Sequence, residues 1–244
     1  MISPDDIRAN YRDCILVIAS QNYYLDMFKQ MISNPSNPFP KQNIWVPRLG
    51  LLYATTGNQY FDCPGMVIGD NETFIDAGFF QGETSREFAR LCNGKYNRII
   101  AFEPDEGAVR SYREKSNDIK DLELFNYALW HCREKLYFKQ TGEGGSQIKS
   151  GADTVVIQAD TIDNILNGEE ATFIKLDVEG AECNTLLGAE KTIRRYKPKL
   201  AISVYHKPED IIEIPLLLKS FRDDYKYYMR HYTSNAFETV LYAY

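Results

Sequence analysis

The sequence predicts an α/β fold in which a mostly parallel sheet carries helices on both faces. From Glu72 onward, short apolar segments alternate with segments of helical periodicity, and this alternation is typical of the βα units that build parallel sheets. The last two apolar segments are joined by residues 232–237 alone. Because a parallel crossover needs about a dozen residues, the chain is expected to end in an antiparallel hairpin at the edge of the sheet.

Two regions are expected along the 244 residues. Residues 1–66 are predicted to form an N-terminal helical and loop extension, because apolar side chains recur at helical spacing over residues 4–32 and prolines at 35, 38 and 40 mark a loop. Residues 67–244 are predicted to form the α/β domain, since a hydrophobic content of 44% supports a substantial core. Aromatic side chains in the extension suit a cap over a ligand crevice or a homodimer contact.

Within the domain, compact apolar runs predict strands, and apolar residues spaced by three and four predict helices. The expected strands are 73–77, 98–102, 122–126, 134–139, 153–158, 172–177, 200–205, 225–231 and 238–242. The expected helices are 84–92, 105–115, 161–166, 182–196 and 210–220. Asp105 is a suitable N-cap for the second helix, and Pro198 follows the end of the fourth. Residues 141–151 form a glycine-rich loop.

The composition narrows the function classes. A net charge of −6 argues against binding to nucleic acid phosphates. Five cysteines without a C-x-x-C pair support neither a disulfide framework nor a zinc site, and scattered thiols fit a cytoplasmic protein. The first ten residues lack the apolar core of a signal peptide, and no apolar stretch reaches the length of a membrane span.

The first candidate site is the turn after the first strand of the domain. Asp76 ends the apolar run, Gly78 and Gly82 follow, and a helix begins near Thr84. Ligands of open α/β sheets bind at the carboxyl ends of strands, where glycine lets the backbone approach a ligand closely. The G-x-x-x-G spacing and the Asp76 carboxylate argue against a dinucleotide pyrophosphate and suit a cationic ligand that carries an amino acid. An ordinary tight turn with a helix cap is the alternative interpretation.

Two further strand ends are suited to bind the ribose and the base of a nucleoside. Glu103 lies 25 residues after Gly78, at the end of the second strand, where a carboxylate can accept hydrogen bonds from both ribose hydroxyls. Asn126 and the residues up to Leu129 follow the third strand, where an adenine ring would lie against apolar atoms. A solvated carboxylate at Glu103 and a plain strand-to-loop junction at Asn126 are the alternative interpretations.

The most specific pattern is the run FIKLDVEGAE at residues 173–182. With Leu186 after it, this run resembles the signature of the FkbM family of methyltransferases. Three earlier segments occur in the order that this family shows, namely 74–78, 102–104 and 126–129. The resemblance covers residues 73–242.

The resemblance implies a Rossmann-like fold that binds S-adenosylmethionine and transfers its methyl group to an oxygen. It implies that the methionine end of this cofactor meets the first turn, and that ribose and adenine meet the next two strand ends. The implied cofactor-binding residues are Asp76, Gly78, Gly82, Thr84, Glu103, Asn126, Ala128 and Asp177. The chain departs from the family at Phe79-Phe80, where a small residue and Asn are frequent, and at Ser203, where Glu is frequent. These departures concern the methyl acceptor more than the cofactor.

Three carboxylates, Asp177, Glu179 and Glu182, lie where the strand 172–177 passes into the next helix. Methyl transfer to an alcohol requires alignment of donor and acceptor and removal of the hydroxyl proton. Asp177 is placed to orient the methionine amine or the acceptor, and Glu179 to bind the acceptor hydroxyl. His206 follows the strand 200–205 and suits a general base. Asp177, Glu179 and His206 are therefore the candidate catalytic residues.

Other interpretations of these side chains stay open. The carboxylates could bind Mg²⁺, but no second ligand-bearing strand is evident and no metal is expected. Glu179 and Glu182 could instead stabilise the start of the helix, and His206 could face solvent. Lys207 and Arg230 are candidates for contact with an anionic substrate, with simple solvation as the alternative.

The sequence therefore predicts an O-methyltransferase that uses S-adenosylmethionine and acts on a hydroxyl of a sugar or small metabolite. Two alternatives come from other classes. One is a module that binds the nucleotide or S-adenosylmethionine without catalysis, which the Phe79-Phe80 departure permits. The other is a nicotinamide-dependent oxidoreductase, which the glycine spacing and Asp76 oppose.

Overall fold

The computed structural model describes residues 16–17, 44–45, 59–139, 147–148, 154–233 and 237–244. The chain divides into two units, Met1–Gly57 with Tyr232–Asn235, and Asn58–His231 with Ala236–Tyr244. In the first unit, β1 (Leu16–Val17) pairs in parallel with β2 (Ile44–Trp45). β1 lies within residues 4–32, which were expected to be helical, so the helix is wrong at these two residues. Most of the rest of the extension predicted for residues 1–66, including its proline-rich loop, lies outside the described residues and stays a prediction.

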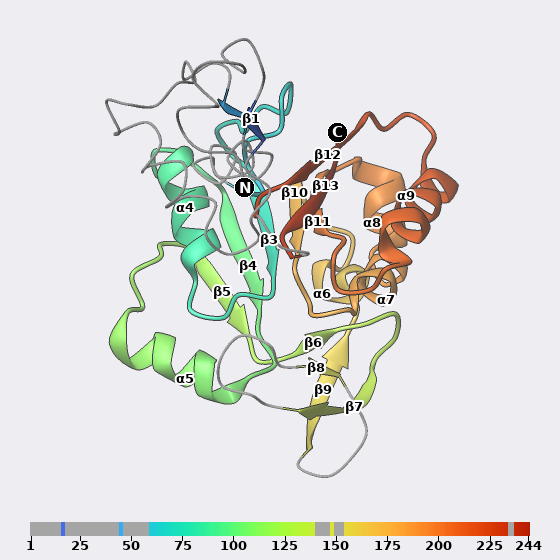
Figure 1. Ribbon diagram of the computed structural model, residues 1–244. Helices are drawn as coiled ribbons and strands as arrows, with labels where there is room; N and C mark the ends of the chain where they lie inside the picture. The colour runs from blue at the N-terminus through green and yellow to red at the C-terminus, as the bar shows by residue number, and fades with distance from the viewer. Residues whose placement is uncertain (1–15, 18–43, 46–58, 140–146, 149–153, 234–236) are drawn as a thin grey trace, which may run out of the picture. The chain divides into compact units, whose positions relative to one another are not determined.

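The second unit is built on a seven-stranded sheet in the order β12-β13-β11-β10-β3-β4-β5 (Figure 1). Its strands are β3 (Thr73–Ala77), β4 (Arg98–Phe102), β5 (Leu122–Phe125), β10 (Phe173–Leu176), β11 (Lys199–Ser203), β12 (Tyr227–His231) and β13 (Thr239–Ala243). The first five pair in parallel, and β13 pairs antiparallel with both β11 and β12. The structure therefore confirms the mostly parallel α/β fold and the C-terminal antiparallel hairpin.

Helices cover both faces of this sheet, with α4 and α5 on one side and α8 and α9 on the other (Figure 1). The helices are α4 (Glu83–Leu91), α5 (Glu106–Lys115), α6 (Ile162–Leu166), α7 (Glu182–Leu187), α8 (Glu190–Tyr196) and α9 (Asp210–Phe221). Asp105 caps α5 as predicted, because its Oδ1 accepts hydrogen bonds from the N–H groups of Gly107 and Ala108 at 2.8 and 3.2 Å. The amphipathic faces of these helices bury the two sides of the sheet.

The two faces of the sheet carry different side chains because neighbouring residues of a strand point to opposite faces. On the α4 side, the rings of Phe74 and Phe88 stack with centroids 4.3 Å apart, and Phe173 meets Phe74 edge-on. On the other side, Ile75 and Ile174 join a large buried cluster that includes side chains from α6 to α9. This double burial fits the central strands of a parallel sheet.

One predicted helix is wrong as a single element. Residues 182–196 were expected to form one helix, but the structure divides them into α7 and α8 at Gly188 and Ala189. A Cβ atom on Gly188 would overlap the carbonyl oxygen of Trp130, and the Gly188 carbonyl accepts the N–H of Asp163 at 2.9 Å. Ala189 has a φ of −115°, outside the helical range. The close approach of the Trp130 backbone therefore accompanies the helix break.

A second, four-stranded sheet follows β5. Its strands are β6 (Ala128–Leu129), β7 (Glu134–Lys139), β8 (Gln147–Ile148) and β9 (Val155–Asp160), in the order β6-β9-β7-β8. Two of these strands correspond to the extra strands expected at 134–139 and 153–158. Most of the predicted loop at 141–151 lies outside the described residues. The short β6 begins two residues after β5 ends, so this sheet brings apolar side chains to the end of the main sheet.

The strand order creates a crevice between β3 and β10. The chain runs from β3 outward to β4 and β5, and later returns to β10 on the other side of β3. At such a switch point the connections leave in opposite directions, and the carboxyl ends of the strands are open to a ligand. No helix in the described part of the chain is long and apolar enough to cross a membrane.

Candidate functional site

A cavity of about 250 Å³ lies at the carboxyl ends of β3, β4 and β10. Six residues predicted from the sequence line it: Gly78, Thr84, Glu103, Ala128, Asp177 and Glu179. The other predicted residues, Asp76, Gly82, Asn126 and His206, lie outside this lining. The switch point of the sheet is therefore hollow, and most of the predicted residues surround the hollow directly.

Gly78 has to be glycine for two reasons. Its φ of 85° is in the left-handed region that residues with a Cβ rarely adopt. A Cβ atom would also overlap the carbonyl oxygen of Asp177, which follows the neighbouring strand β10. The backbone after β3 therefore lies against the backbone after β10, and the N–H of Gly78 is held by the carbonyl of Phe102 at 3.1 Å.

The Phe79-Phe80 pair, which departs from the family pattern, fills part of this turn. Phe79 is buried against the ring of Tyr112, with centroids 4.9 Å apart. Phe80 has a φ of 48°, a conformation that Asn adopts more readily than Phe. Gly82, with a φ of 85°, precedes α4, and a Cβ atom on it would lie 2.6 Å from the Phe79 ring. Gly82 thus shapes the turn from behind the cavity wall.

Asp76 lies behind the cavity wall and is fully buried. Its Oδ1 is 3.1 Å from Nζ of Lys175, and its Oδ2 accepts a hydrogen bond from Ser85 Oγ at 2.6 Å. The parallel register pairs Asp76 directly with Lys175 across β3 and β10. The ammonium also donates to the carbonyl oxygen of Gly78 at 2.7 Å. The carboxylate predicted to meet a ligand therefore holds a lysine that fixes the glycine turn.

Glu103 is also held in place, but it stays in the cavity wall. Its Oε1 accepts the N–H of Asp105 at 2.8 Å, and its Oε2 accepts the N–H of Phe80 at 2.7 Å. Burial raises the pKa of Glu103, and these two backbone donors oppose that rise. Asn126 does not reach the cavity, because its amide donates to the carbonyls of Glu103 and Pro104. Asn126 therefore fixes the position of Glu103.

The far end of the cavity is apolar. Leu129 from β6, Phe138 from β7 and Ile148 from β8 meet Phe102 and Tyr127 there. Sequence reasoning placed Ala128 at this end but missed Phe138 and Ile148 as wall residues. The strands that carry them belong to the second sheet, and local periodicity does not reveal how that sheet packs. An apolar wall with few polar groups suits a flat aromatic ring.

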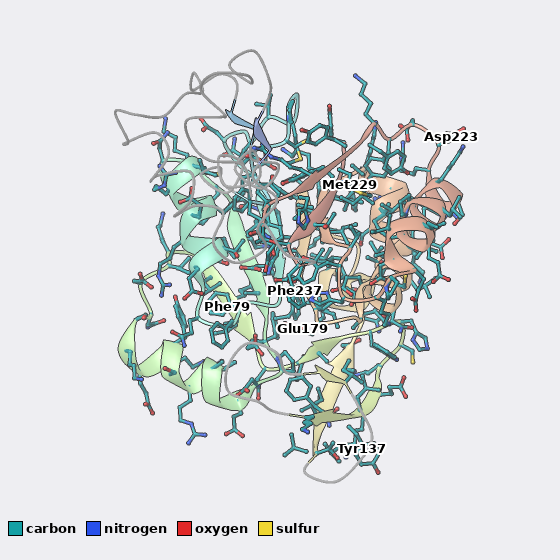
Figure 2. All side chains as sticks on the ribbon, in the orientation of Figure 1. Phe79, Tyr137, Glu179, Asp223, Met229 and Phe237 are labelled. Carbon is teal, nitrogen blue, oxygen red and sulfur yellow. The ribbon has the colours of Figure 1, made fainter. Side chains whose placement is uncertain are left out.

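A second cavity of about 280 Å³ adjoins the first. The two cavities share the wall residues Ile148, Glu179 and Ala181. The rest of the second wall consists of Trp130, Gly180, His206 and Lys207. Figure 2 labels Glu179 and Phe79, which lie toward the same edge of the sheet from different loops. Glu179 thus lies in the walls of both an apolar-ended cavity and a more polar one.

The predicted catalytic residues meet around His206, whose side chain is only 7% exposed. Its Nε2 lies 3.4 Å from Glu179 Oε2 and 3.6 Å from Asp177 Oδ1. Its Nδ1 lies 2.9 Å from Oε1 of Glu182, which is fully buried. The strand ends of β10 and β11 therefore bring together all three predicted catalytic side chains, with Glu182 behind the imidazole.

Asp177 is fixed by two tyrosines that sequence reasoning did not assign to the site. The hydroxyl of Tyr60 donates to its Oδ2 at 3.0 Å, and the hydroxyl of Tyr205 donates to its Oδ1 at 3.2 Å. Tyr205 also packs on the imidazole of His206, with ring centroids 4.1 Å apart. Tyr60 precedes the first predicted strand, and nothing in its local sequence marks it as a site residue.

The charges of the cluster are strongly coupled. Burial raises the pKa of Glu179 to about 7, although the charge of His206 opposes this. Burial lowers the pKa of His206, but the carboxylates of Glu182, Asp177 and Glu179 outweigh it and give a net rise. Burial opposes ionisation of Asp177 as well, yet Lys175 and His206 hold its pKa below the ordinary value. Around neutral pH Glu179 therefore changes its protonation state beside an imidazole whose protonated form is favoured.

The same cluster is where a metal ion could be held. Ligand atoms of Asp177, Glu182 and His206 lie within 4.8 Å of one another. Both Asp177 oxygens already accept hydrogen bonds from phenols, so an ion would have to displace or share these contacts. The side chains are therefore already placed for proton transfer. Binding of a metal ion would require them to rearrange.

Comparisons with known proteins agree with this geometry. Residues 70–227, more than half of the chain, match the methyltransferase FkbM domain. The crystal structure of methyltransferase FkbM from Methylobacillus flagellatus KT is 28% identical with a TM-score of 0.65, and the match covers 79% of this chain and 48% of that chain. This chain therefore spans about half the length of that relative. None of the curated proteins matches the chain significantly.

A more distant likeness concerns the fold alone. Fibrillarin from Aeropyrum pernix, solved with natively bound S-adenosyl-L-methionine, is 10% identical with a TM-score of 0.50 over 80% of this chain and 74% of that chain. The family match includes both the Gly78 turn and the segment from Lys175 to Glu182. The chain belongs to the FkbM family of methyltransferases, whose cofactor is S-adenosylmethionine.

Proposed function

We propose that the domain transfers the methyl group of S-adenosylmethionine to a hydroxyl of a sugar or small metabolite. One observation carries this proposal: the cavity at the switch point shares the wall residue Glu179 with a second cavity, beside His206 and Asp177. A methyl donor in the first cavity and an alcohol in the second would meet beside groups able to accept a proton.

The residues of the first cavity fit the cofactor. Gly78 lines this cavity, and its backbone can lie there only because it has no Cβ atom, which would overlap the Asp177 carbonyl oxygen. Glu103 presents a carboxylate fixed by two backbone donors to the ribose hydroxyls. The apolar end with Phe138 and Leu129 suits adenine. When bound there, S-adenosylmethionine supplies a methyl group activated by a positively charged sulfur.

The negative side chains favour that positive charge. Asp177 is ionised and lines the first cavity, since Lys175 and His206 keep its pKa low. Its two tyrosine partners fix the direction of the carboxylate. We assign Asp177 to orientation of the cofactor amine or of the acceptor, because opposite charges and fixed dipoles act strongly in a partly buried site.

The chain then has to remove the proton of the acceptor hydroxyl. Glu179 and His206 Nε2 lie 3.4 Å apart and share the wall of the second cavity. We assign proton removal to this pair, since a group with a pKa near the working pH is the most effective base. Glu182 holds the other imidazole nitrogen from the buried side, which fixes the ring so that Nε2 faces the cavity.

Binding and methyl transfer test this function separately. Titration calorimetry with S-adenosylmethionine should show binding, and NADH should not bind. Glu103→Gln should weaken cofactor binding by roughly tenfold or more, because hydrogen bonds to a charged group contribute about 1.5–3 kcal/mol. Glu114→Gln, an exposed change on α5, is the matched control and should bind normally.

Transfer is measured with S-adenosylmethionine labelled in the methyl group, against pools of carbohydrates and small alcohols. Glu179→Gln should retain cofactor binding and lose most of the transfer. Absence of cofactor binding would refute the proposal. Binding without transfer to any pool would favour the non-catalytic module instead.

A further inference from the structure

We propose that the second cavity is an acceptor subsite for one sugar ring that carries a carboxylate or a phosphate, held between Trp130 and Lys207. The inference rests on the proposed methyl transfer and names the substrate class for it. The shared wall at Glu179 and Ala181 sets the orientation. A ring in the second cavity would present one hydroxyl beside Glu179, on the side that the two cavities share, where the oxygen could meet the methyl group directly.

The size of the cavity limits what it can take. Its volume is about 280 Å³, and pockets for drug-sized ligands range from about 300 to 1,000 Å³. A single ring with its substituents fits within this volume. A large macrocycle or a folded polyketide would have to lie mostly outside the walls.

Trp130 provides an amphipathic wall. Trp130 is half-buried and lines the cavity, and its indole N–H has no hydrogen-bond partner among the described residues. Its backbone is fixed, because its N–H donates to the Asp160 carbonyl at 2.9 Å and its carbonyl lies against Gly188. A flat apolar face beside a free donor matches a sugar, which has C–H groups on its faces and hydroxyls at its rim.

Lys207 provides a positive charge in the cavity wall. Its ammonium forms no ion pair within the described part of the chain, although Glu179 and His206 lie in the same wall. Its N–H donates to Asp210 Oδ2 at 3.2 Å, which fixes its backbone at the start of α9. Because a lysine ammonium is a compact point charge, it suits either a carboxylate or a phosphate on the ring.

Gly180 lets the lysine lie where it does. A Cβ atom at Gly180 would be 3.3 Å from Cε and 3.9 Å from Nζ of Lys207. The lysine side chain therefore crosses directly over the turn that carries Glu179. The anionic group and the reacting hydroxyl would be bound on adjacent residues of one turn, as expected for substituents of the same small ring.

Matched pairs of methyl glycosides test the inference in the full-length protein. Methyl glucoside, galactoside and mannoside are compared with the corresponding uronides and 6-phosphates, with labelled S-adenosylmethionine as donor. For at least one of these three sugars, kcat/KM should be roughly tenfold higher for an anionic form than for the neutral methyl glycoside. Preference for uronides identifies carboxylate recognition, and preference for 6-phosphates identifies phosphate recognition.

Two variants of cavity residues and one control variant test which side chains cause the preference for anionic sugars. Lys207→Met should bring the ratio of anionic to neutral sugar close to one through a higher KM for the anionic sugar. Trp130→Phe should raise KM severalfold for both sugars, because the ring face stays and the donor is lost. Lys191→Met, an exposed change on α8, should leave the ratio unchanged.

The inference is overturned if kcat/KM is the same for the neutral and anionic forms of all three sugars. It is also overturned if Lys207→Met leaves the ratio of anionic to neutral kcat/KM unchanged. Transfer to a non-sugar alcohol with none to any glycoside also overturns it, while the proposed methyl transfer would stand. Failure to bind S-adenosylmethionine would instead overturn the proposed function itself.

Discussion

The buried pair of Asp76 and Lys175 allows a quantitative prediction. We expect Lys175→Met to destabilise the domain by about 3–5 kcal/mol, because removal of one partner leaves an uncompensated buried charge. Asp76 is fully buried, and in the variant only the hydroxyl of Ser85 would remain near its carboxylate. The carbonyl oxygens of Ala77 and Gly78 would lose their donor as well. For a domain of this size, the loss corresponds to a drop in Tm of roughly 10 °C.

Urea unfolding followed by circular dichroism measures this loss. The double variant Lys175→Met, Asp76→Asn removes both charges and should recover a large part of the stability, since a neutral pair carries a much smaller desolvation cost. Arg110→Met is the matched control: its contact with Glu106 is 4.0 Å long and more than 60% exposed on both sides, so the change should cost at most about 0.5 kcal/mol.

The reasoning would be refuted if Lys175→Met were as mild as the exposed control. It would also fail if the double variant were no more stable than the single one. A further readout concerns the site: the double variant should still bind S-adenosylmethionine more weakly than the original chain, because Gly78 has lost the lysine that fixes its carbonyl.

Three further predictions address the turn, the proton and the metal. Gly78→Ala should abolish cofactor binding and destabilise the fold, because the Cβ atom would overlap the Asp177 backbone; Gly94→Ala shares a positive φ but has open space and should cost only about 1–2 kcal/mol in urea unfolding. The transfer rate should rise as pH increases through about 7, the pKa to which burial raises Glu179, and Glu179→Gln should remove this rise. Because the folded protein holds that proton more tightly than the unfolded chain, stability should fall as pH rises from about 4.5 to about 7, and Glu179→Gln should lessen the fall. Treatment with EDTA should leave transfer within about twofold; loss of activity that Mn²⁺ restores would instead make Asp177, Glu182 and His206 metal ligands.

The sequence was sufficient for features that depend on local pattern. The alternation of strands and helices and the short final connection predicted the sheet and its hairpin. Gly78, Glu103 and Asp177 could be placed at strand ends because each follows a recognisable apolar run. In an α/β sheet such ends meet at one edge, so position along the chain was enough to bring them to a common crevice.

Features that depend on register between distant strands could not be predicted. Asp76 was expected to meet a ligand, but its neighbour in the sheet is Lys175. The two residues are far apart along the chain, and no local signal at either one points to the other. Tyr60 reaches Asp177 from a segment with weak periodicity. The division between α7 and α8 likewise depends on contact with Trp130, which lies far away along the chain.

That division also links two distant parts of the domain. Gly188 allows the backbone of Trp130 to pass at close range, and Trp130 lines the second cavity. Any larger side chain at position 188 would displace Trp130, although residue 188 does not itself line the cavity. Changes of acceptor preference among relatives can therefore arise from a helix junction that never touches the acceptor, and a mutational search confined to the cavity would overlook them.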